Sequence, residues 1–384
     1  GAGGGGGRFQ VKTWGQQQNL ALGIRFGMAE TQGNRNTMED RVVVIGDYKF
    51  RRRSSCSSVT VPADTVARPK VAFFGVYDGH GGEETAERLR AVLHRRVLDH
   101  PLFLLREEGP DGGPGGGGGR VAEAMEEGCL LADTEILDAD WQKLCRQQEK
   151  FQEKGAQKNL QNATTNFSGS TAIFALVMKP PDSDETTVYV ANVGDCRAVL
   201  CRGPGGLAEE LSEDCKPSRP DETARIEEAG GYIHGGRLNG VLAVSRSFGD
   251  INHKAFPPPN HLWVAQQLIS KPEITSVAVT PDAEFLVLAC DGLWDVLTSQ
   301  QACNYVRRRL AEHRDVQRAA QDLVKKALDY GSVDNVSCVV CCFHQEDRAA
   351  HGKALQKLFG GAVGGGAVGG GGGSPPAPHS PADS

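Results

Sequence analysis

Acidic residues that follow apolar, strand-like runs are the part of this sequence best suited to chemistry. The run at residues 71–77 ends in Asp78 and Gly79, and the run at 285–289 is followed closely by Asp291. An Asp at the end of a buried strand is held rigidly, and a neighbouring glycine lets a ligand approach the backbone. A single Asp-Gly pair is more simply a turn that closes a strand. The repetition of the pattern needs another explanation.

More acids occupy the same kind of position, just before or after an apolar run. They are Glu39, Asp40, Asp195, Asp295 and Asp334. Burying so many carboxylates together is unfavourable unless cations neutralise them. An all-oxygen ligand set favours hard ions such as Mg²⁺ or Mn²⁺ over zinc. The sequence therefore predicts a hydrolytic centre with two bound metal ions.

These acids must be positioned by strands, and the hydrophobic pattern predicts where the strands lie. Apolar runs predict strands at 24–28, 41–45, 71–77, 170–177, 187–193, 197–201, 285–289 and 336–343. A 3.6-residue period predicts helices around 86–97, 121–136, 300–312 and 316–329. Strands that come in groups, with helices between the groups, are typical of an α+β domain.

Three glycine-rich segments divide the chain, at residues 1–7, 109–119 and 360–384. Such segments bury too little apolar surface to offset the entropy that is lost on ordering. We therefore expect a flexible N-terminus over residues 1–21 and one domain over 22–346, with a glycine-rich loop at 109–119. We expect a flexible Gly/Pro-rich tail over 347–384.

The composition excludes several classes of function. A net charge of -6 argues against nucleic-acid binding, because contact with phosphates needs clustered Lys and Arg. No apolar run approaches the roughly 20 residues of a transmembrane helix. The 11 cysteines are an odd number, and the first residues contain no basic and apolar leader. Both features favour an intracellular, reducing location, cytoplasmic or nuclear.

A series of ordered motifs connects the acids with other polar residues. They are GNRNTMED (33–40), YDGHGG (77–82), SGSTA (168–172), NVGDCR (192–197), RLNG (237–240), LAVSRSFGD (242–250), DGLWD (291–295) and DN (334–335). In type and order they resemble the motifs of the metal-dependent serine/threonine protein phosphatases, also called the protein phosphatase 2C family. The alpha- and beta-type branch is the most similar. The resemblance covers roughly residues 22–346.

The resemblance implies a fold of two stacked antiparallel β-sheets flanked by helices, with the metal site at one end. Asp78 would bridge two ions of Mn²⁺ or Mg²⁺. The Gly79 carbonyl, helped by Glu39 through water, would bind one ion, and Asp291 and Asp334 would bind the other. No residue is expected to bind an organic cofactor.

The same resemblance gives roles to residues beside these ligands. Asp195 and Asp295 match the ligands of a weaker third ion, although either could be a plain turn or helix-cap residue. Arg35 matches the arginine that binds the substrate phosphate, and the alternative is a surface arginine. His80 matches the proposed general acid, and the alternative is a histidine that caps the following helix.

Asp40 and Asn335 match residues that support the metal ligands. Near Arg35 and His80 the chain departs from the pattern of its relatives at a few positions, namely Asn34, Asn36, Thr37, Gly81 and Gly82. We expect these departures to affect substrate preference and turnover, whereas the metal ligands themselves are retained.

Together these features predict an enzyme that hydrolyses phosphoserine and phosphothreonine in phosphoprotein substrates and acts as a monomer. A water activated by two metal ions would attack phosphorus, so no covalent intermediate is needed. A serine nucleophile is disfavoured because no histidine and acid pair is arranged to activate one. The alternatives are a phosphatase-like binding protein with little turnover and a hydrolase of small phosphate esters. Loss of Asp78, Asp291 or Asp334 would have favoured the first alternative.

Overall fold

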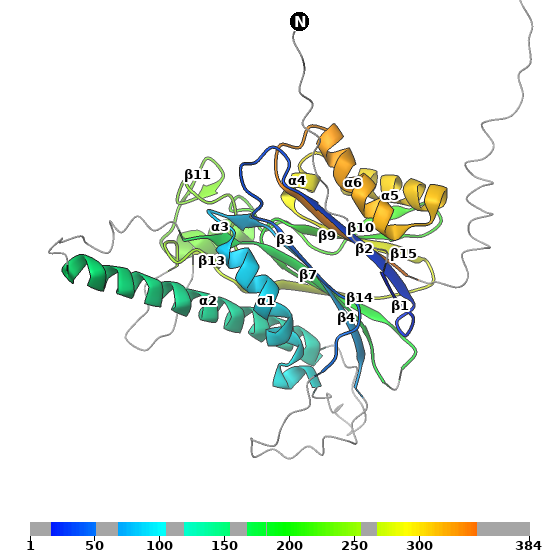
Figure 1. Cartoon of the computed structure of the whole chain (residues 1–384), viewed down its shortest axis with the longest axis horizontal. Coiled ribbons are helices and arrows are strands. Elements are labelled where there is room, and N and C mark those ends of the chain that lie inside the picture. Colours follow the sequence, from blue (N-terminus) through cyan, green and yellow to red (C-terminus); the bar gives the residue numbers. More distant parts are fainter. Residues whose placement is uncertain are drawn as a thin grey trace, which may run out of the picture. The chain divides into compact units, whose positions relative to one another are not determined.

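Two antiparallel β-sheets form the centre of the structure (Figure 1). The computed structural model describes residues 17–50, 68–104, 119–153, 167–181, 183–254 and 267–343. The chain divides into two units, residues 1–345 and 346–384. Every described residue lies in the first unit.

The two large sheets have six and five strands. The six-stranded sheet has the order β1 (Gln17–Asn19), β2 (Ile24–Thr31), β16 (Val336–Cys342), β15 (Ala283–Ala289), β9 (Arg197–Arg202) and β10 (Leu207–Glu210). The five-stranded sheet has the order β14 (Glu273–Ala278), β8 (Thr187–Val193), β7 (Ala172–Lys179), β4 (Lys70–Tyr77) and β3 (Arg41–Ile45). A small sheet contains β13 (Phe248–Gly249), β6 (Gly169–Ser170) and β5 (Gly79–His80), and a hairpin contains β11 (Ile233–His234) and β12 (Arg237–Leu238).

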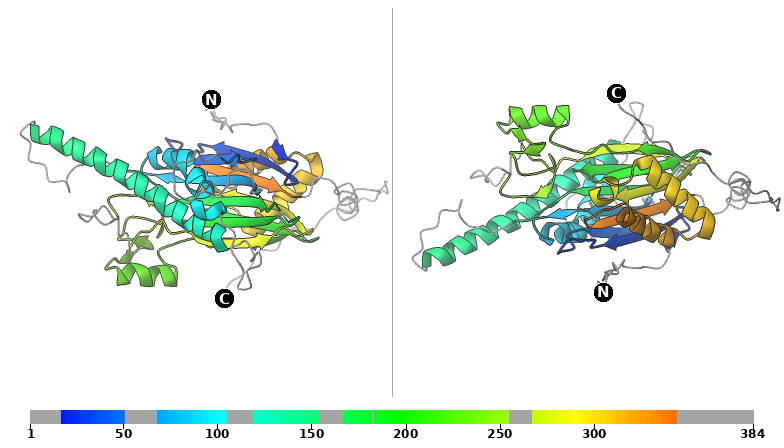
Figure 2. Two further views of the ribbon diagram at one scale, coloured as in Figure 1. Left: turned by 90° about the horizontal axis from the view of Figure 1, so that it is seen from below. Right: turned by 90° about the horizontal axis from the view of Figure 1, so that it is seen from above.

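Helices cover the outer face of each large sheet, as the views from above and below show (Figure 2). The five-stranded sheet is covered by α1 (Glu84–Leu98) and α2 (Gly119–Glu153), and the six-stranded sheet by α5 (Ser299–His313) and α6 (Val316–Asp329). The short helical segments are η1 (Pro101–Leu104), α3 (Pro220–Glu228) and α4 (Asp291–Trp294). The α+β fold of two stacked sheets flanked by helices is therefore confirmed.

Apolar side chains point alternately into two cores along the strands. In β4, Phe73 packs in the core beneath α1 and α2, whereas Phe74 packs in the core between the two sheets. Successive side chains of a strand point to opposite faces, so a strand buried on both faces needs a continuous apolar run. A third core lies between the six-stranded sheet and α5 and α6. Burial of each of these phenylalanine side chains stabilises the folded state by roughly 1.5–3 kcal/mol relative to exposure to water.

A close approach between α6 and β2 holds α6 against the six-stranded sheet. A Cβ atom at Gly27 would collide with the backbone of Gln317, so β2 needs glycine at this position. The Gln317 side chain accepts a hydrogen bond from Met28 N at 3.1 Å and donates one to Met28 O at 2.6 Å. The helix begins after Asp315, whose carboxylate caps the backbone of the first turn.

The sequence predicts most of these elements correctly. The bounds of β3, β8 and α6 agree with the prediction at both ends. The predicted strand at 170–177 is divided into β6 and β7, and α2 continues well beyond residue 136. Several elements are not predicted, among them β1, β10, β14 and α3.

β1 corrects the expected N-terminal boundary. The sequence predicts flexibility over residues 1–21, but Gln17–Asn19 pair with β2, and Asn19 is buried. The Asn19 side chain donates a hydrogen bond to Gly46 O at 2.6 Å, which connects the two sheets. Apart from Gly119, the predicted loop at 109–119 lies outside the described residues, and so does the tail at 347–384.

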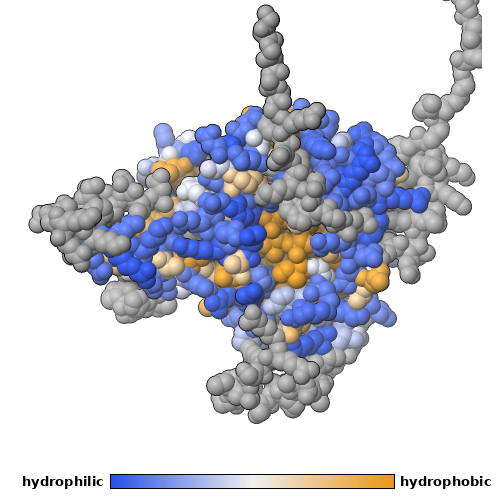
Figure 3. All heavy atoms as spheres, in the orientation of Figure 1, coloured by the Kyte–Doolittle hydropathy of each residue, from blue (hydrophilic) through white to orange (hydrophobic). Residues whose placement is uncertain are grey.

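The outer faces of α5 and α6 are mainly hydrophilic (Figure 3), because their apolar stripes face the six-stranded sheet. The longest helix, α2, has 35 residues, and charged side chains occur along its whole length. In the part of the chain that the structure describes, no helix combines the length and apolar character needed to span a bilayer.

Candidate metal centre and active site

Strand ends bring acidic residues to one end of the two sheets. Asp40 directly precedes β3, and Asp78 directly follows β4. Because neighbouring antiparallel strands run in opposite directions, the start of β3 and the end of β4 share one edge. By the same reasoning Asp291, after β15, lies near Asp334, before β16. Asp195 follows β8, in the same sheet as β4.

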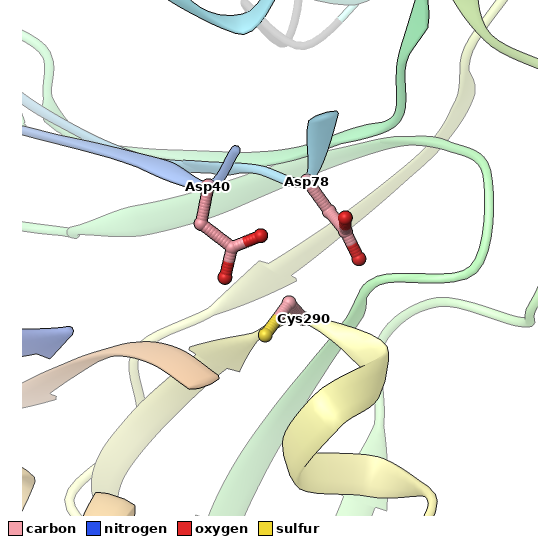
Figure 4. Close-up of side chains that lie close together, drawn as sticks. All are labelled: Asp40, Asp78 and Cys290. Carbon is pink, nitrogen blue, oxygen red and sulfur yellow. The ribbon is translucent and has the colours of Figure 1, made fainter. Parts of the chain in front are cut away.

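Asp78 lies at the centre of the acidic site. Asp78, Asp195 and Asp291 each offer a carboxylate oxygen, and these oxygens all lie within 4.8 Å of one another. A second group, formed by Asp40, Asp78 and Cys290, meets the same limit (Figure 4). In Figure 4 the two carboxylates extend from the ends of neighbouring strands, and Cys290 lies next to the start of α4.

The carboxylates of this site repel one another. Burial raises the pKa of Asp78 well above its usual range, and the charges of Asp40 and Asp291 raise it further. Burial and the charge of Asp195 raise the pKa of Asp291 to about 7. Burial is also the main cause that raises the pKa of Asp40 to about 6. A bound cation would remove this repulsion.

The donor atoms fit a hard divalent cation. Two oxygens that bind one ion at about 2.1–2.4 Å lie at most about 4.2–4.8 Å apart. This distance agrees with the 4.8 Å limit within the Asp78, Asp195 and Asp291 group. Asp40 Oδ2 is buried, and Asp78, Ser337 and Cys290 lie close enough to the Asp40 carboxylate to oppose the rise of its pKa that burial causes.

Cys290 differs from the other donors because it is a thiol. Burial raises the pKa of Cys290 well above its usual value, so the thiol stays protonated. Its sulfur accepts a hydrogen bond from Ser337 N at 3.2 Å and donates one to Asn335 O at 3.5 Å. Sulfur is a soft donor and therefore a poor ligand for Mg²⁺ or Mn²⁺. Cys290 therefore supports the loop that carries Asp291.

Arg35 lies beside the acidic site. Its guanidinium forms an ion pair with Asp334, with 2.5 Å between Nη2 and Oδ2. The side chains of Arg35 and Asp334 are 57% and 30% exposed, so both can be reached by a substrate. The other oxygen of Asp334 accepts a hydrogen bond from Asn335 N at 2.7 Å. Asp334 belongs to neither of the two close groups around Asp78.

Glu39 and Gly79 lie together at the edge of the site. A Cβ atom at Gly79 would lie 2.6 Å from the carbonyl oxygen of Glu39, so the close approach requires glycine. Glu39 N donates a hydrogen bond to Asn335 Oδ1 at 2.7 Å, and Asn335 Nδ2 donates to Gln32 O and Thr37 O. Asn335 therefore holds the loop that carries Arg35 and Glu39 against β16, in agreement with the supporting role expected for it.

Asp195 has a cationic partner that the sequence does not predict. The Lys216 ammonium forms an ion pair with the Asp195 carboxylate, which is 5% exposed. Asp295 lies one turn after Asp291, at the C-terminal cap of α4. Burial raises the pKa of Asp295, and the charge of Lys216 opposes this effect. The positions of Asp195 and Asp295 are compatible with a further ion and with the simpler turn and cap roles.

His80 is held by a buried carboxylate. Its Nε2 atom lies 2.7 Å from Oδ2 of Asp250. Burial would lower the pKa of His80, but the hydrogen bond and charge of Asp250 outweigh this effect and raise it. Burial would raise the pKa of Asp250, but the bond and charge of His80 lower it below its usual value. The N-terminal cap of α1 is Glu83, so the expected alternative, in which His80 caps this helix, is wrong.

The sequence that forms this site also matches a known protein family. The family model described as protein phosphatase 2C matches residues 24–336. This chain belongs to the protein phosphatase 2C family. The match includes every acid of the site and both Arg35 and His80.

Curated relatives in this family match most of the chain. A probable protein phosphatase 2C 54 of Oryza sativa subsp. japonica is 30% identical over 328 residues, which cover 85% of this chain and 75% of the relative. A protein phosphatase 2C homolog 2 of Schizosaccharomyces pombe is 31% identical over 346 residues, which cover 88% of this chain and 76% of the relative.

Solved structures show the same fold. A serine-threonine phosphatase 2C from Toxoplasma gondii superimposes with a TM-score of 0.60 at 21% identity, covering 87% of this chain and 99% of that one. A sex-determining protein of C. elegans superimposes with a TM-score of 0.57 at 22% identity, covering 88% of this chain and 67% of that one. At this level of identity the likeness concerns the fold alone.

Membership in the protein phosphatase 2C family makes this chain a metal-dependent serine/threonine protein phosphatase. Its acidic cluster agrees with metal binding, and phosphoproteins are the substrates of the family. The comparisons give no support to the alternative of a binding protein with little turnover.

Two residues that contact the predicted site residues are not predicted from the sequence, namely Lys216 and Asp250. Asp250 ends the motif at 242–250, but no role is predicted for it. Asp250 lies 170 residues from His80, and Lys216 lies 21 residues from Asp195, so no local spacing joins either pair. His80 and Asp250 form a histidine and acid pair, but Ser247 donates its hydrogen bond to the acid, so this pair does not activate Ser247 as a nucleophile.

Proposed function

We propose that this phosphatase works with two ions of Mg²⁺ or Mn²⁺ at the Asp78 site, with a weaker third ion beside Asp195. The observation that carries the proposal is the group of Asp78, Asp195 and Asp291, whose oxygens lie within 4.8 Å of one another. Such a group is unfavourable without cations and matches the ligand preference of hard ions.

The assignment of ligands rests on the resemblance to the family, and the closeness of the acidic side chains supports it. Asp78 would be shared by both ions, and its carboxylate lies close to those of Asp195 and Asp291. The Gly79 carbonyl and Glu39 would hold one ion, and Asp291 and Asp334 would hold the other. Asp195 and Asp295 would hold the third. When bound, the ions activate the attacking water and neutralise the phosphate charge.

Two further residues act on the substrate. The Arg35 guanidinium can bind two phosphate oxygens through its planar fork, and its exposed position next to Asp334 makes it accessible. His80 donates a proton to the serine or threonine oxygen that leaves. An alkoxide is a poor leaving group, so this proton matters most for phosphoprotein substrates.

We propose further that the enzyme is a monomer and works inside the cell, in the cytoplasm or nucleus. Free cysteines support the intracellular location. In the described part of the chain ten cysteines are free, and nine of them are buried. A chain that folded in an oxidising compartment would more often pair its cysteines.

The test is hydrolysis of a phosphoserine peptide by purified protein in EDTA, followed by separate additions of Mg²⁺, Mn²⁺ and Ca²⁺. Activity should disappear in EDTA and return with Mg²⁺ or Mn²⁺ in the millimolar range, because weakly held hard ions exchange readily. After EDTA has been removed by dialysis, calorimetric titration of the metal-free protein with Mg²⁺ or Mn²⁺ should give two sites and a weaker third. Full activity in EDTA would contradict the metal mechanism, and a preference for a small ester over the peptide would favour the other substrate class.

A further inference from the structure

The small three-stranded sheet brings His80 and Asp250 together. His80 is in β5, Gly169 is in β6, and Gly249 is in β13, so Gly169 pairs with both outer strands. Asp250 follows β13 directly. Its carboxylate meets the His80 ring above Gly169, where a Cβ atom would collide with Asp250 Oδ2 and His80 Nε2. The contact therefore depends on glycine at position 169.

The Asp250 carboxylate is held in one position by several bonds. The oxygen that meets His80 also accepts a hydrogen bond from Ser247 Oγ at 2.6 Å. Asp133 of α2 accepts bonds from Gly249 N at 2.8 Å and from the Lys254 ammonium at 2.6 Å. Lys254 in turn donates to Ser247 O at 2.9 Å. This segment is therefore anchored on both sides of Asp250.

The backbone of Asp250 adopts a conformation that is unusual for a residue other than glycine. Its φ angle is 52°, in the left-handed region. Such a conformation costs on the order of 1 kcal/mol and persists only where the surroundings enforce it. The conformation directs the carboxylate to His80 rather than to solvent, since the Asp250 side chain is 4% exposed.

We propose that Asp250 is the residue that positions His80 for proton donation. The bond through Nε2 fixes the plane of the ring and leaves Nδ1 for the substrate, and the ring is 32% exposed. Among the described residues, the ring makes no second hydrogen bond. This inference rests on the proposed role of His80 as general acid.

The proton transfer then follows a defined course. As the bond between phosphorus and the serine oxygen breaks, its electron pair remains on that oxygen. The proton on Nδ1 moves to the oxygen and gives the serine hydroxyl. The ring becomes neutral and keeps its proton on Nε2, bonded to Asp250. Asp250 itself exchanges no proton and acts only through His80.

The decisive experiment compares Asp250→Asn, His80→Gln and the double variant on two substrates, a phosphoserine peptide and p-nitrophenyl phosphate. Asn has nearly the same shape as Asp and tolerates a left-handed backbone well. For Asp250→Asn, kcat on the peptide should fall about 10- to 100-fold or more, the lower range being that for loss of a residue that orients a metal-bound histidine, with KM nearly unchanged. Hydrolysis of p-nitrophenyl phosphate should fall much less, because nitrophenolate leaves without a proton.

The double variant tests whether Asp250 acts through His80. His80→Gln alone should lower peptide turnover by roughly 10²- to 10⁴-fold, and adding Asp250→Asn should lower it no further. Asp322→Asn is the matched control. Its side chain is 14% exposed and pairs with Arg309 across α5 and α6, so its loss should leave the ratio of the two activities unchanged.

Equal losses on both substrates for Asp250→Asn, or losses that multiply in the double variant, would overturn the inference. If His80→Gln alone lowered both activities equally, the acid role of His80 would fail, and the Asp250 inference would fail with it. Because that result comes from the His80 variant alone, the two failures can be told apart.

A second measurement observes the His80 ring directly in the wild-type protein. The ¹⁵N spectrum of histidines in the wild-type, Mg²⁺-loaded protein reports which ring nitrogen carries the proton, and His80→Gln identifies the His80 signals. At a pH where the ring is neutral, we expect the proton on Nε2. A proton on Nδ1 instead would show that Asp250 does not fix the ring as proposed.

Discussion

At the scale of single residues, the carboxylates of the metal centre are placed to bind cations, but their mutual repulsion destabilises the metal-free protein. We expect Asp291→Asn to abolish turnover, as should Asp78→Asn, because a metal ligand is lost. In EDTA at about pH 8, however, Asp291→Asn should raise the melting temperature by about 2 °C or more, since it removes one repelling charge. Calorimetric unfolding of the wild-type and Asp291→Asn proteins in EDTA measures the two melting temperatures. A lower melting temperature would mean that Asp291 is not under repulsion.

The same carboxylates predict how pH changes the stability of the metal-free protein. The pKa of Asp40 is raised to about 6 and that of Asp291 to about 7, so the folded state binds protons more tightly than the unfolded state. Stability from these groups is present at low pH and is lost as pH rises through these values. In EDTA the free energy of unfolding should therefore fall from about pH 5.5 to about pH 8. Saturating Mg²⁺ should reverse or flatten the slope, and a metal-free slope of opposite sign would refute the prediction.

Arg35 allows a further prediction about one residue. Arg35→Ala should raise KM for a phosphoserine peptide clearly, because the charged donor for the substrate phosphate is lost. Arg35→Lys should restore KM only in part, since an ammonium cannot form the bidentate fork. Steady-state kinetics at saturating Mn²⁺ measures both values. An unchanged KM in Arg35→Ala would make Arg35 a surface residue that merely pairs with Asp334.

At the scale of elements, two glycines offer a contrast between stability and catalysis. Gly27→Ala pushes β2 away from the backbone of α6 and should cost about 1–3 kcal/mol of stability with kcat unchanged. Gly169→Ala instead pushes His80 and Asp250 apart and should lower peptide turnover far more than p-nitrophenyl phosphate hydrolysis. Urea unfolding and kinetics on the two substrates separate the effects. A similar fall in kcat for both variants would contradict this division.

The elements also show how far sequence reasoning reaches. The bounds of β8 could be predicted because it is an apolar run between polar turns, and those of α6 because its buried residues recur with the helical period. No residue of β10 or β14 is fully buried, so both strands lack an apolar pattern. The acids could be predicted as a group from repeated strand ends. The bonds of Asp250 to His80 and of Lys216 to Asp195 depend on tertiary packing, which no local pattern encodes.

At the scale of the whole molecule, the active site joins the beginning and the end of the described chain. β2 pairs with β16, so residues 24–31 lie beside residues 336–342. Asn335 bonds the backbone of Gln32 and Thr37, and Arg35 pairs with Asp334. The site is therefore complete only when both ends of the domain are in place. Truncation can be tolerated only outside these strands.

The position of β1 determines how many N-terminal residues can be removed without loss of stability. A form that lacks residues 1–16 and 360–384 should keep the kcat and melting temperature of the full chain, because β1 and every described strand remain. Removing residues 1–20 instead also removes β1 and Asn19, whose side chain bonds Gly46 and caps the turn at Ala21 and Leu22. The longer deletion should lower the melting temperature measurably, while kcat at low temperature stays close to that of the full chain. If the shorter deletion already lowered kcat, residues before β1 or in the C-terminal tail would have to contribute to the site.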